Sequence, residues 1–359
     1  MNSGTNSRCT VGRRTQWPCG LALWRLPVWG SILLGFAAPA QAQDCTDSSL
    51  STCVDSNPLW LPAGDSDFAS VDSAAAQLPG TGTAALSAQY AHKPLVLTAP
   101  GPDPYGTEIP ALGHVLDMTL ASSVGLLPRL EVGAAVPFVL NQSGSGVSAG
   151  TSIQTEEVSQ VALRDPRLSI GFELFDVPGD ELRLSSKATY TLSLPLGDET
   201  AFAGERGVVN APQVAVVARW RRFTFGTGLG LRLRAPVQLA DARVGSQLSA
   251  SLGLAFDPLD KRRLTVALEA WALPSLVSQL HTTSGGTQVS SNQVPSEWLL
   301  SARSTLFEDF SAQLGFGTAI PLSSSTRTTT SGQESRESFA ALPAAQFRVL
   351  LALRYLFRP

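Results

Sequence analysis

The chain has 359 residues, of which 43% are apolar and only 15% are charged, and its net charge is −3. A charge near zero argues against nucleic-acid binding, which needs a basic surface. After residue 42 no apolar run is long enough for a transmembrane helix, so a helical membrane protein is also excluded.

The first 42 residues have the pattern of an export signal. Three arginines and no acid lie in the first 14 residues, the apolar stretch LPVWGSILLGFAAP follows, and residues 40–42 read Ala-Gln-Ala. A basic start, an apolar core and a small-x-small cleavage site define a signal peptide, whereas a membrane anchor would need a longer apolar core. We therefore expect residues 1–42 to be a signal peptide.

Residues 43–80 contain Asp, Ser and Pro without periodicity. After removal of the signal, Cys45 and Cys53 are the remaining cysteines. Two cysteines that close a short loop in an exported chain are typical of a disulfide. A metal-binding pair is the alternative, but no histidine lies nearby. We expect a periplasmic N-terminal extension, outside any barrel and closed by the Cys45–Cys53 disulfide.

From about residue 83 apolar residues alternate with small or polar ones, in runs of about ten residues separated by turn signals. In FGTGLGLRLR, residues 225–234, the larger apolar residues fall on one face and Gly226, Gly228 and Gly230 on the other. Such glycines could also cradle a phosphate, but no helix follows them to receive one. We interpret the stretch as a strand with an almost bare inner face.

About twelve such strands are predicted over residues 81–359, and short connections between them alternate with long ones. Short turns at one rim, long loops at the other and an even strand number are typical of an outer-membrane barrel. A soluble β-sandwich is the alternative, but it would not need this alternation. The expected fold is all-β, a transmembrane antiparallel up-and-down β-barrel. The strands are predicted at 83–92, 114–126, 129–138, 166–175, 182–195, 212–220, 223–234, 247–257, 262–273, 297–306, 310–321 and 345–357, and the long loops at 93–113, 139–165, 196–211, 235–246, 274–296 and 322–344.

Aromatic residues support the membrane interpretation, because seven of them lie beside the short turns or at the chain end. In a barrel they would gather at one rim as a girdle at the membrane interface. Closure of the sheet also follows from physics, since a sheet edge in lipid would leave backbone groups unpaired. The seven are Trp220, Phe223, Phe256, Phe307, Phe310, Tyr355 and Phe357.

The alternation also predicts which charged residues line the lumen. Three arginines, Arg232, Arg234 and Arg348, fall toward the outer half with few acids nearby, whereas most of the others fall near the periplasmic rim and can pair there. Unpaired positive charge along a water-filled passage attracts anions, so a narrow, weakly anion-preferring pore is predicted. The complete inward set is Asp117, Glu131, Glu173, Arg183, Lys187, Arg219, Arg232, Arg234, Glu269, Arg303, Arg348 and Arg354.

Over residues 58–359 the chain resembles a known family. The segments WLPAGDSDFASVDSAAAQLPGTGTAALSAQYAHKPLVL, GLLPRLEVGAAVPFVL, RDPRLSIGFEL and LSLPLGD resemble the barrel portion of outer-membrane-protein-A-related proteins from myxobacteria. The last two are also similar to the phenol-degradation-pathway barrel family. The resemblance implies an outer-membrane barrel. Members of the first family commonly continue into a peptidoglycan-binding domain, which we do not expect in this chain.

No catalytic, cofactor-binding or metal site is predicted. An outer-membrane lipid hydrolase would need a serine and a histidine within hydrogen-bonding reach. His92 and His114 flank the first long loop with Ser87 nearby, but no histidine–serine motif of that family is present. The acidic pairs Asp65/Asp67 and Glu156/Glu157 lack the spacing of metal ligands and are expected to be solvated.

The expected function is that of a narrow passive pore or small-solute transporter in the outer membrane of a Gram-negative bacterium. A non-conducting structural or surface-interaction barrel with a plugged lumen is the alternative, followed by a lipid hydrolase. The expected partners are outer-membrane lipid, the barrel-insertion machinery and small solutes, and no nucleic acid.

Overall fold

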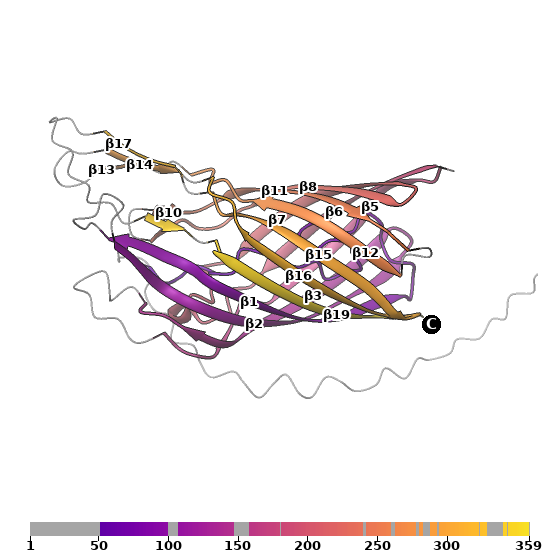
Figure 1. Cartoon of the computed structure of the whole chain (residues 1–359), viewed down its shortest axis with the longest axis horizontal. Coiled ribbons are helices and arrows are strands. Elements are labelled where there is room, and N and C mark those ends of the chain that lie inside the picture. The colour runs from indigo at the N-terminus through magenta and orange to yellow at the C-terminus, as the bar shows by residue number, and fades with distance from the viewer. Residues whose placement is uncertain are drawn as a thin grey trace, which may run out of the picture. The chain divides into compact units, whose positions relative to one another are not determined.

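Twelve long antiparallel strands form a closed barrel in the computed structural model (Figure 1). The structure describes residues 51–99, 107–146, 158–179, 181–239, 242–259, 263–277, 280–282, 288–292, 294–322, 324–328, 340–342 and 344–358. The strands are β1 (Gly82–Ala99), β2 (Thr107–Leu127), β3 (Leu130–Ser143), β5 (Arg167–Val177), β6 (Leu182–Ser193), β7 (Val209–Trp220), β8 (Phe223–Arg232), β11 (Gln247–Phe256), β12 (Leu264–Ala272), β15 (Ser296–Phe307), β16 (Phe310–Ala319) and β19 (Phe347–Phe357).

The barrel closes at β1, which pairs with β2 on one side and β19 on the other. Gly82 lies opposite Val124 in the first pairing and opposite Phe357 in the second. Every strand therefore has two hydrogen-bonded neighbours, and the twelve-stranded up-and-down barrel expected from the sequence is confirmed. Among the described residues no helix is long and apolar enough to cross a membrane.

Short turns join the strands at one end of the barrel, where β19 also ends, and long connections join them at the other. We call these the short-turn end and the long-loop end. The long connections contain η2 (Glu199–Ala201) and the short strands β4 (Ala162–Leu163), β9 (Val237–Leu239), β10 (Ala242–Val244), β13 (Leu280–Thr282), β14 (Gln288–Asn292), β17 (Ser324–Thr328) and β18 (Ala340–Leu342).

One connection differs from the expected loop at 93–113. β1 continues to Ala99 and β2 begins at Thr107, and these two residues still face each other across the pair. The register shifts just after His92, and Lys93 adopts a left-handed backbone with φ of 46°. A bulge of this kind bends a hairpin without ending it, so strand pairing extends well into the predicted loop.

The outer surface of the barrel is apolar. Large aliphatic side chains stand outward on successive strands, and Leu252, Leu268 and Leu314 are each more than half exposed. Trp220, Phe223 and Phe256 form a chain of ring contacts beside two short turns, with centroids 6.1 and 5.1 Å apart. An apolar band flanked by an aromatic rim is the surface that a membrane-spanning barrel presents to lipid.

Residues 51–80, which we call the inner segment, lie in the interior except at their end, where residues 78–80 are exposed. Each of three buried apolar clusters combines residues of this segment with residues of the barrel. The one at the long-loop end includes Cys53, Val54 and Leu97; the next includes Leu59 and Ala69; and the third is formed by Phe68, Val71, Ala255 and Ala267. The expectation of an extension outside the barrel is therefore wrong for the described part of 43–80. The twelve-stranded wall needs apolar and polar partners inside it, and this segment supplies them.

Candidate functional site

The inner segment runs through the lumen from one end to the other. At the long-loop end, the Ser56 amide donates to the carbonyl of Phe202, which directly follows η2. At the short-turn end, the Gly80 amide donates to the carbonyl of Gly125, near the turn between β2 and β3. The segment has almost no regular secondary structure, so its backbone polar groups are free to meet the side chains that point inward.

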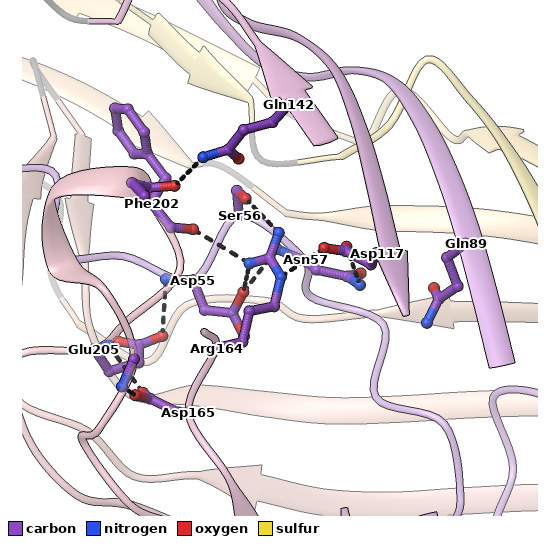
Figure 2. A network of polar contacts seen from close by, with 12 residues as sticks. Asp55, Ser56, Asn57, Gln89, Asp117, Gln142, Arg164, Asp165, Phe202 and Glu205 are labelled. Atoms are coloured by element: carbon purple, nitrogen blue, oxygen red, sulfur yellow. Dashed lines mark hydrogen bonds and ion pairs between the residues drawn. The ribbon is translucent and has the colours of Figure 1, made fainter. Parts of the chain in front are cut away.

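Arg164 fastens the segment at the long-loop end (Figure 2). Its side chain is 2% exposed and forms ion pairs with Asp55 of the inner segment and with Asp117 of β2, whose Oδ1 lies 2.8 Å from Nε. The same guanidinium donates to Ser56 Oγ and to the carbonyl of Phe202, each at 3.2 Å. One buried cation therefore joins the inner segment, the barrel wall and a long connection.

Two further carboxylates are buried beside this network, as Figure 2 shows. Asp165 accepts hydrogen bonds from the amides of Gly197 and Glu205, at 2.7 and 2.9 Å. Burial disfavours its charged form more than these bonds favour it, and raises the pKa of Asp165 to about 7. Burial also raises the pKa of Glu205, although its ion pair with Arg234 acts in the opposite direction. The folded connections at this end thus hold a group that titrates near neutrality.

Arg348 lies in the half of the lumen nearer the long-loop end and is completely buried. It forms a two-pronged ion pair with Glu297, with N–O distances of 2.7 and 3.0 Å, and donates to Asn57 and Gln89 at 3.0 and 2.9 Å. Asn57 in turn donates to Asp117 at 2.9 Å. The inner segment is therefore part of a continuous hydrogen-bonded layer across the barrel.

Glu269 of β12 and Lys187 of β6 hold the segment farther from the long-loop end, near the middle of their strands. The Glu269 carboxylate accepts from the amides of Ala69 and Ser70 at 2.9 and 2.7 Å, and from the Ser70 hydroxyl at 2.7 Å. Lys187 lies 3.4 Å from Asp72 and 3.7 Å from Glu131. The buried carboxylate is thus hydrogen-bonded by three neutral donors and the buried ammonium lies between two acids, so neither group is left unsatisfied.

The short-turn end is held by arginines of the wall and acids of the segment. Arg303 forms an ion pair with Asp65, and Arg219 lies 3.1 Å from Asp67. Arg303 and Arg354 both donate to the carbonyl of Ser66. Arg219 and Arg303 were expected to pair across the interior with acids of the wall, whereas their ion-pair partners in the structure are Asp65 and Asp67. The expectation that these two acids are merely solvated is wrong.

Ten of the twelve predicted lumen residues contact the inner segment, and an eleventh, Arg234, pairs with Glu205 in a long connection. Arg183 is the exception, because its side chain is nearly half exposed and pairs with Asp176 at the short-turn rim. Glu173 accepts from the amide of Ala76 at 3.0 Å. The interpretation of Arg234 and Arg348 as unpaired is wrong, since they pair with Glu205 and Glu297. Arg232 does match the expectation, because it has no ion pair with any described residue.

Sequence reasoning missed the partners that complete the site: Asp55, Asp65, Asp67, Asp72, Arg164, Glu205 and Glu297. One signal was available, because the predicted inward set holds eight cations and four acids, and the acid-rich stretch at 55–72 could supply the missing charge. Cys53 is buried, but Cys45 lies outside the described residues, so the disulfide stays a prediction. The described residues hold no cluster with metal-ligand character.

One histidine on the barrel has the contacts of a catalytic base. His114 on β2 lies with Nδ1 3.0 Å from Ser143 Oγ and with Nε2 3.3 Å from Asn141 Oδ1, both on β3. With the proton on Nε2, the ring donates to Asn141 and accepts from the serine hydroxyl. From the sequence, Ser87 is the candidate serine near this histidine, but Ser87 is a buried residue of β1.

No family model matches the chain, and no curated protein matches it either. Among solved structures it is similar to an outer-membrane channel from Pseudomonas putida F1, with 14% identity, a TM-score of 0.53, and coverage of 79% of this chain and 98% of that one. It also matches the NanC porin, with 7% identity, a TM-score of 0.41, and coverage of 76% and 98%, and the KdgM porin, with 7% identity, a TM-score of 0.38, and coverage of 76% and 99%.

The first likeness supports the fold of an outer-membrane barrel. Together with the apolar, aromatic-rimmed outer surface, it locates the protein in an outer membrane. The resemblance to outer-membrane-protein-A-related proteins of myxobacteria remains an expectation.

Proposed function

We propose that the protein is an outer-membrane channel for small solutes whose lumen is closed at rest by the inner segment. The observation that carries this proposal is that the wall has a polar inner face, which is covered by a separate part of the chain, the inner segment. The inward side chains of the strands are mainly small or polar, such as Ser87, Thr119, Ser185, Thr224 and Ser251. A wall of this kind would surround a polar passage if the segment were absent.

The contacts of the segment suit a closure that can be released. Its described polar contacts with the wall are hydrogen bonds and ion pairs, which water can replace when the segment leaves. The larger apolar side chains that the segment buries against the barrel are five: Cys53, Val54, Leu59, Phe68 and Val71.

Single-channel recording in planar bilayers tests the proposal. The full chain should be closed for most of the recording, and Arg303→Gln/Arg354→Gln, which removes two wall contacts to Ser66, should open more often. Arg183→Gln is the matched control, because this residue pairs with Asp176 at the rim. Silence of both the wild type and the double variant would instead indicate a non-conducting structural barrel. Equal conductance of all three proteins would show that the segment does not close the lumen.

A second candidate function, hydrolysis of a lipid ester, rests on Ser143, His114 and Asn141. A serine that donates to a histidine whose other nitrogen is held by a third group is the arrangement that activates a nucleophile. Turnover of a phospholipid by the wild type, abolished in Ser143→Ala and retained in Ser145→Ala, would support this activity. No turnover by the wild type would eliminate it.

A further inference from the structure

A cavity of about 110 Å³ lies within the lumen between the inner segment and the wall. The segment contributes residues 58–64, and the wall contributes among others Arg167 from β5, Arg232 from β8 and Trp271 from β12. One water occupies on the order of 10–15 Å³ on this measure. The cavity therefore has room for several waters or for one small organic molecule.

Three side chains of this cavity have donors without acceptors. Arg167 is 8% exposed and Trp271 is 6% exposed, and neither Arg167 Nε nor Trp271 Nε1 has a hydrogen-bond partner. No hydrogen bond or ion pair links Arg232 to any other described residue. A guanidinium cannot lose its proton in a protein, and an indole N–H can only donate. The three groups can be satisfied only by something that accepts hydrogen bonds.

Trp60 of the inner segment positions both arginines. The guanidinium carbons of Arg232 and Arg167 lie 4.1 and 4.9 Å from the centroid of its ring. A cation over an aromatic face is stabilised, but its N–H groups at the edge of the plane stay free to bind a ligand. The two cations are thus held in place before any ligand arrives.

The acids near the cavity do not neutralise these arginines. Asp72 and Glu131 also line it, but Lys187 lies within 3.4 Å of the first and 3.7 Å of the second. Asp55, at the long-loop end, forms an ion pair with Arg164. A buried cation, Arg167, beside a half-buried one, Arg232, is costly to fold without an anion, which argues that an anion belongs beside them.

The rest of the lining indicates what kind of anion fits. Leu59, Leu61 and Leu273, with the rings of Trp60 and Trp271, make a large part of the wall apolar. We propose that the cavity binds a small organic carboxylate, with the carboxylate on Arg167 and Arg232 and a short apolar body against the leucine and tryptophan side chains. This ligand is a solute class for the channel proposed above, and its role in transport rests on that function.

Butyrate is a suitable probe, and butyramide is its neutral counterpart of nearly the same shape. The purified full chain in detergent should bind butyrate saturably, followed by tryptophan fluorescence and calorimetry. Loss of one charged hydrogen-bonding partner costs about 1.5–3 kcal/mol, or roughly tenfold to 150-fold in affinity. Arg167→Gln and Arg232→Gln should each weaken butyrate binding by such a factor. Arg183→Gln, which lies outside this cavity, should bind as the wild type does.

A purely structural role for the two arginines predicts a different result. If they only hold the fold together, each Gln variant should unfold at lower urea concentration. If they serve a ligand, removal of an unpaired buried charge should leave the urea midpoint of the ligand-free protein unchanged or raise it.

The proposal fails if the wild type does not bind butyrate, if butyramide binds equally well, or if neither variant weakens binding. Because binding is measured without a membrane, absence of conductance would overturn the channel and leave this result standing.

Discussion

The packing of Phe68 against two glycines predicts how firmly the inner segment is docked. The ring is 1% exposed and lies against Gly226 of β8 and Gly253 of β11. A Cβ atom at residue 226 would lie 2.6 Å from Phe68 Cε2, and one at residue 253 would lie 2.5 Å from Cε1. Both distances are too short for carbon atoms. Replacement of either glycine by alanine must therefore displace the ring or the wall.

The magnitude follows from the size of the clash. The strands on both sides are paired and cannot recede easily, so the ring has to move and the segment with it. Overpacking of a buried site by one methyl group costs about 1–3 kcal/mol. Since each 1.4 kcal/mol is a factor of ten, Gly226→Ala should raise the undocked fraction of the segment by about 5-fold to 150-fold.

Amide hydrogen exchange measures this fraction directly. The amides of Ala69 and Ser70 donate to Glu269, so they exchange only when the segment leaves its site. Their exchange should accelerate by the same factor in Gly226→Ala, and Phe68→Leu in that background should offset part of the clash. Gly315→Ala on β16 is the control, because its new Cβ would meet Ser301 and Leu350 at ordinary distances of 3.4 and 3.5 Å. Unchanged exchange in a folded Gly226→Ala protein would refute this account of the docking.

Three other predictions follow from the contacts described. Replacement of Arg348 by Gln leaves Glu297 buried without its cation and should lower the free energy of unfolding in urea by about 3–5 kcal/mol, whereas a loss below 1 kcal/mol would contradict the pairing. Because the pKa of Asp165 is about 7 in the folded state and near 3.8 when unfolded, the folded state binds the proton more tightly, so stability should fall as pH rises between these values. Asp165→Asn should make that fall shallower, and the part that remains belongs to other buried carboxylates with a raised pKa, such as Glu205. Thiol labelling of exported protein without reductant should find no free cysteine if Cys45 and Cys53 are paired, and two reactive thiols would exclude the bond.

The wall of the barrel could be predicted because its pattern is local. Alternation in a stretch such as residues 223–234 depends only on which face meets lipid, and the turns are marked by short polar sequences. Inward charges such as Arg348 and Glu269 were found by the same count along each strand. The sequence pattern failed at Lys93, where a single left-handed residue lets the hairpin continue.

The position of the inner segment in the lumen could not be predicted, because it depends on contacts between residues that are distant in the sequence and show no periodicity. The inner segment has no repeat that marks a face, and Asp67 and Arg219 are separated by 152 positions. Gly226 shows the difference most clearly: its inward orientation follows from the pattern, whereas the aromatic ring that occupies the space beside it comes from Phe68.

The position of the inner segment directly before β1 has a consequence for assembly. β1 and β19, the first and last strands of the wall, meet at the seam that closes the barrel. A segment already lying among the inward charges when this seam forms is enclosed without being threaded lengthwise through a finished cylinder. In that order of events the early part of the chain serves as an internal template, and the arginines and acids of later strands gather on it before the last strand joins the first.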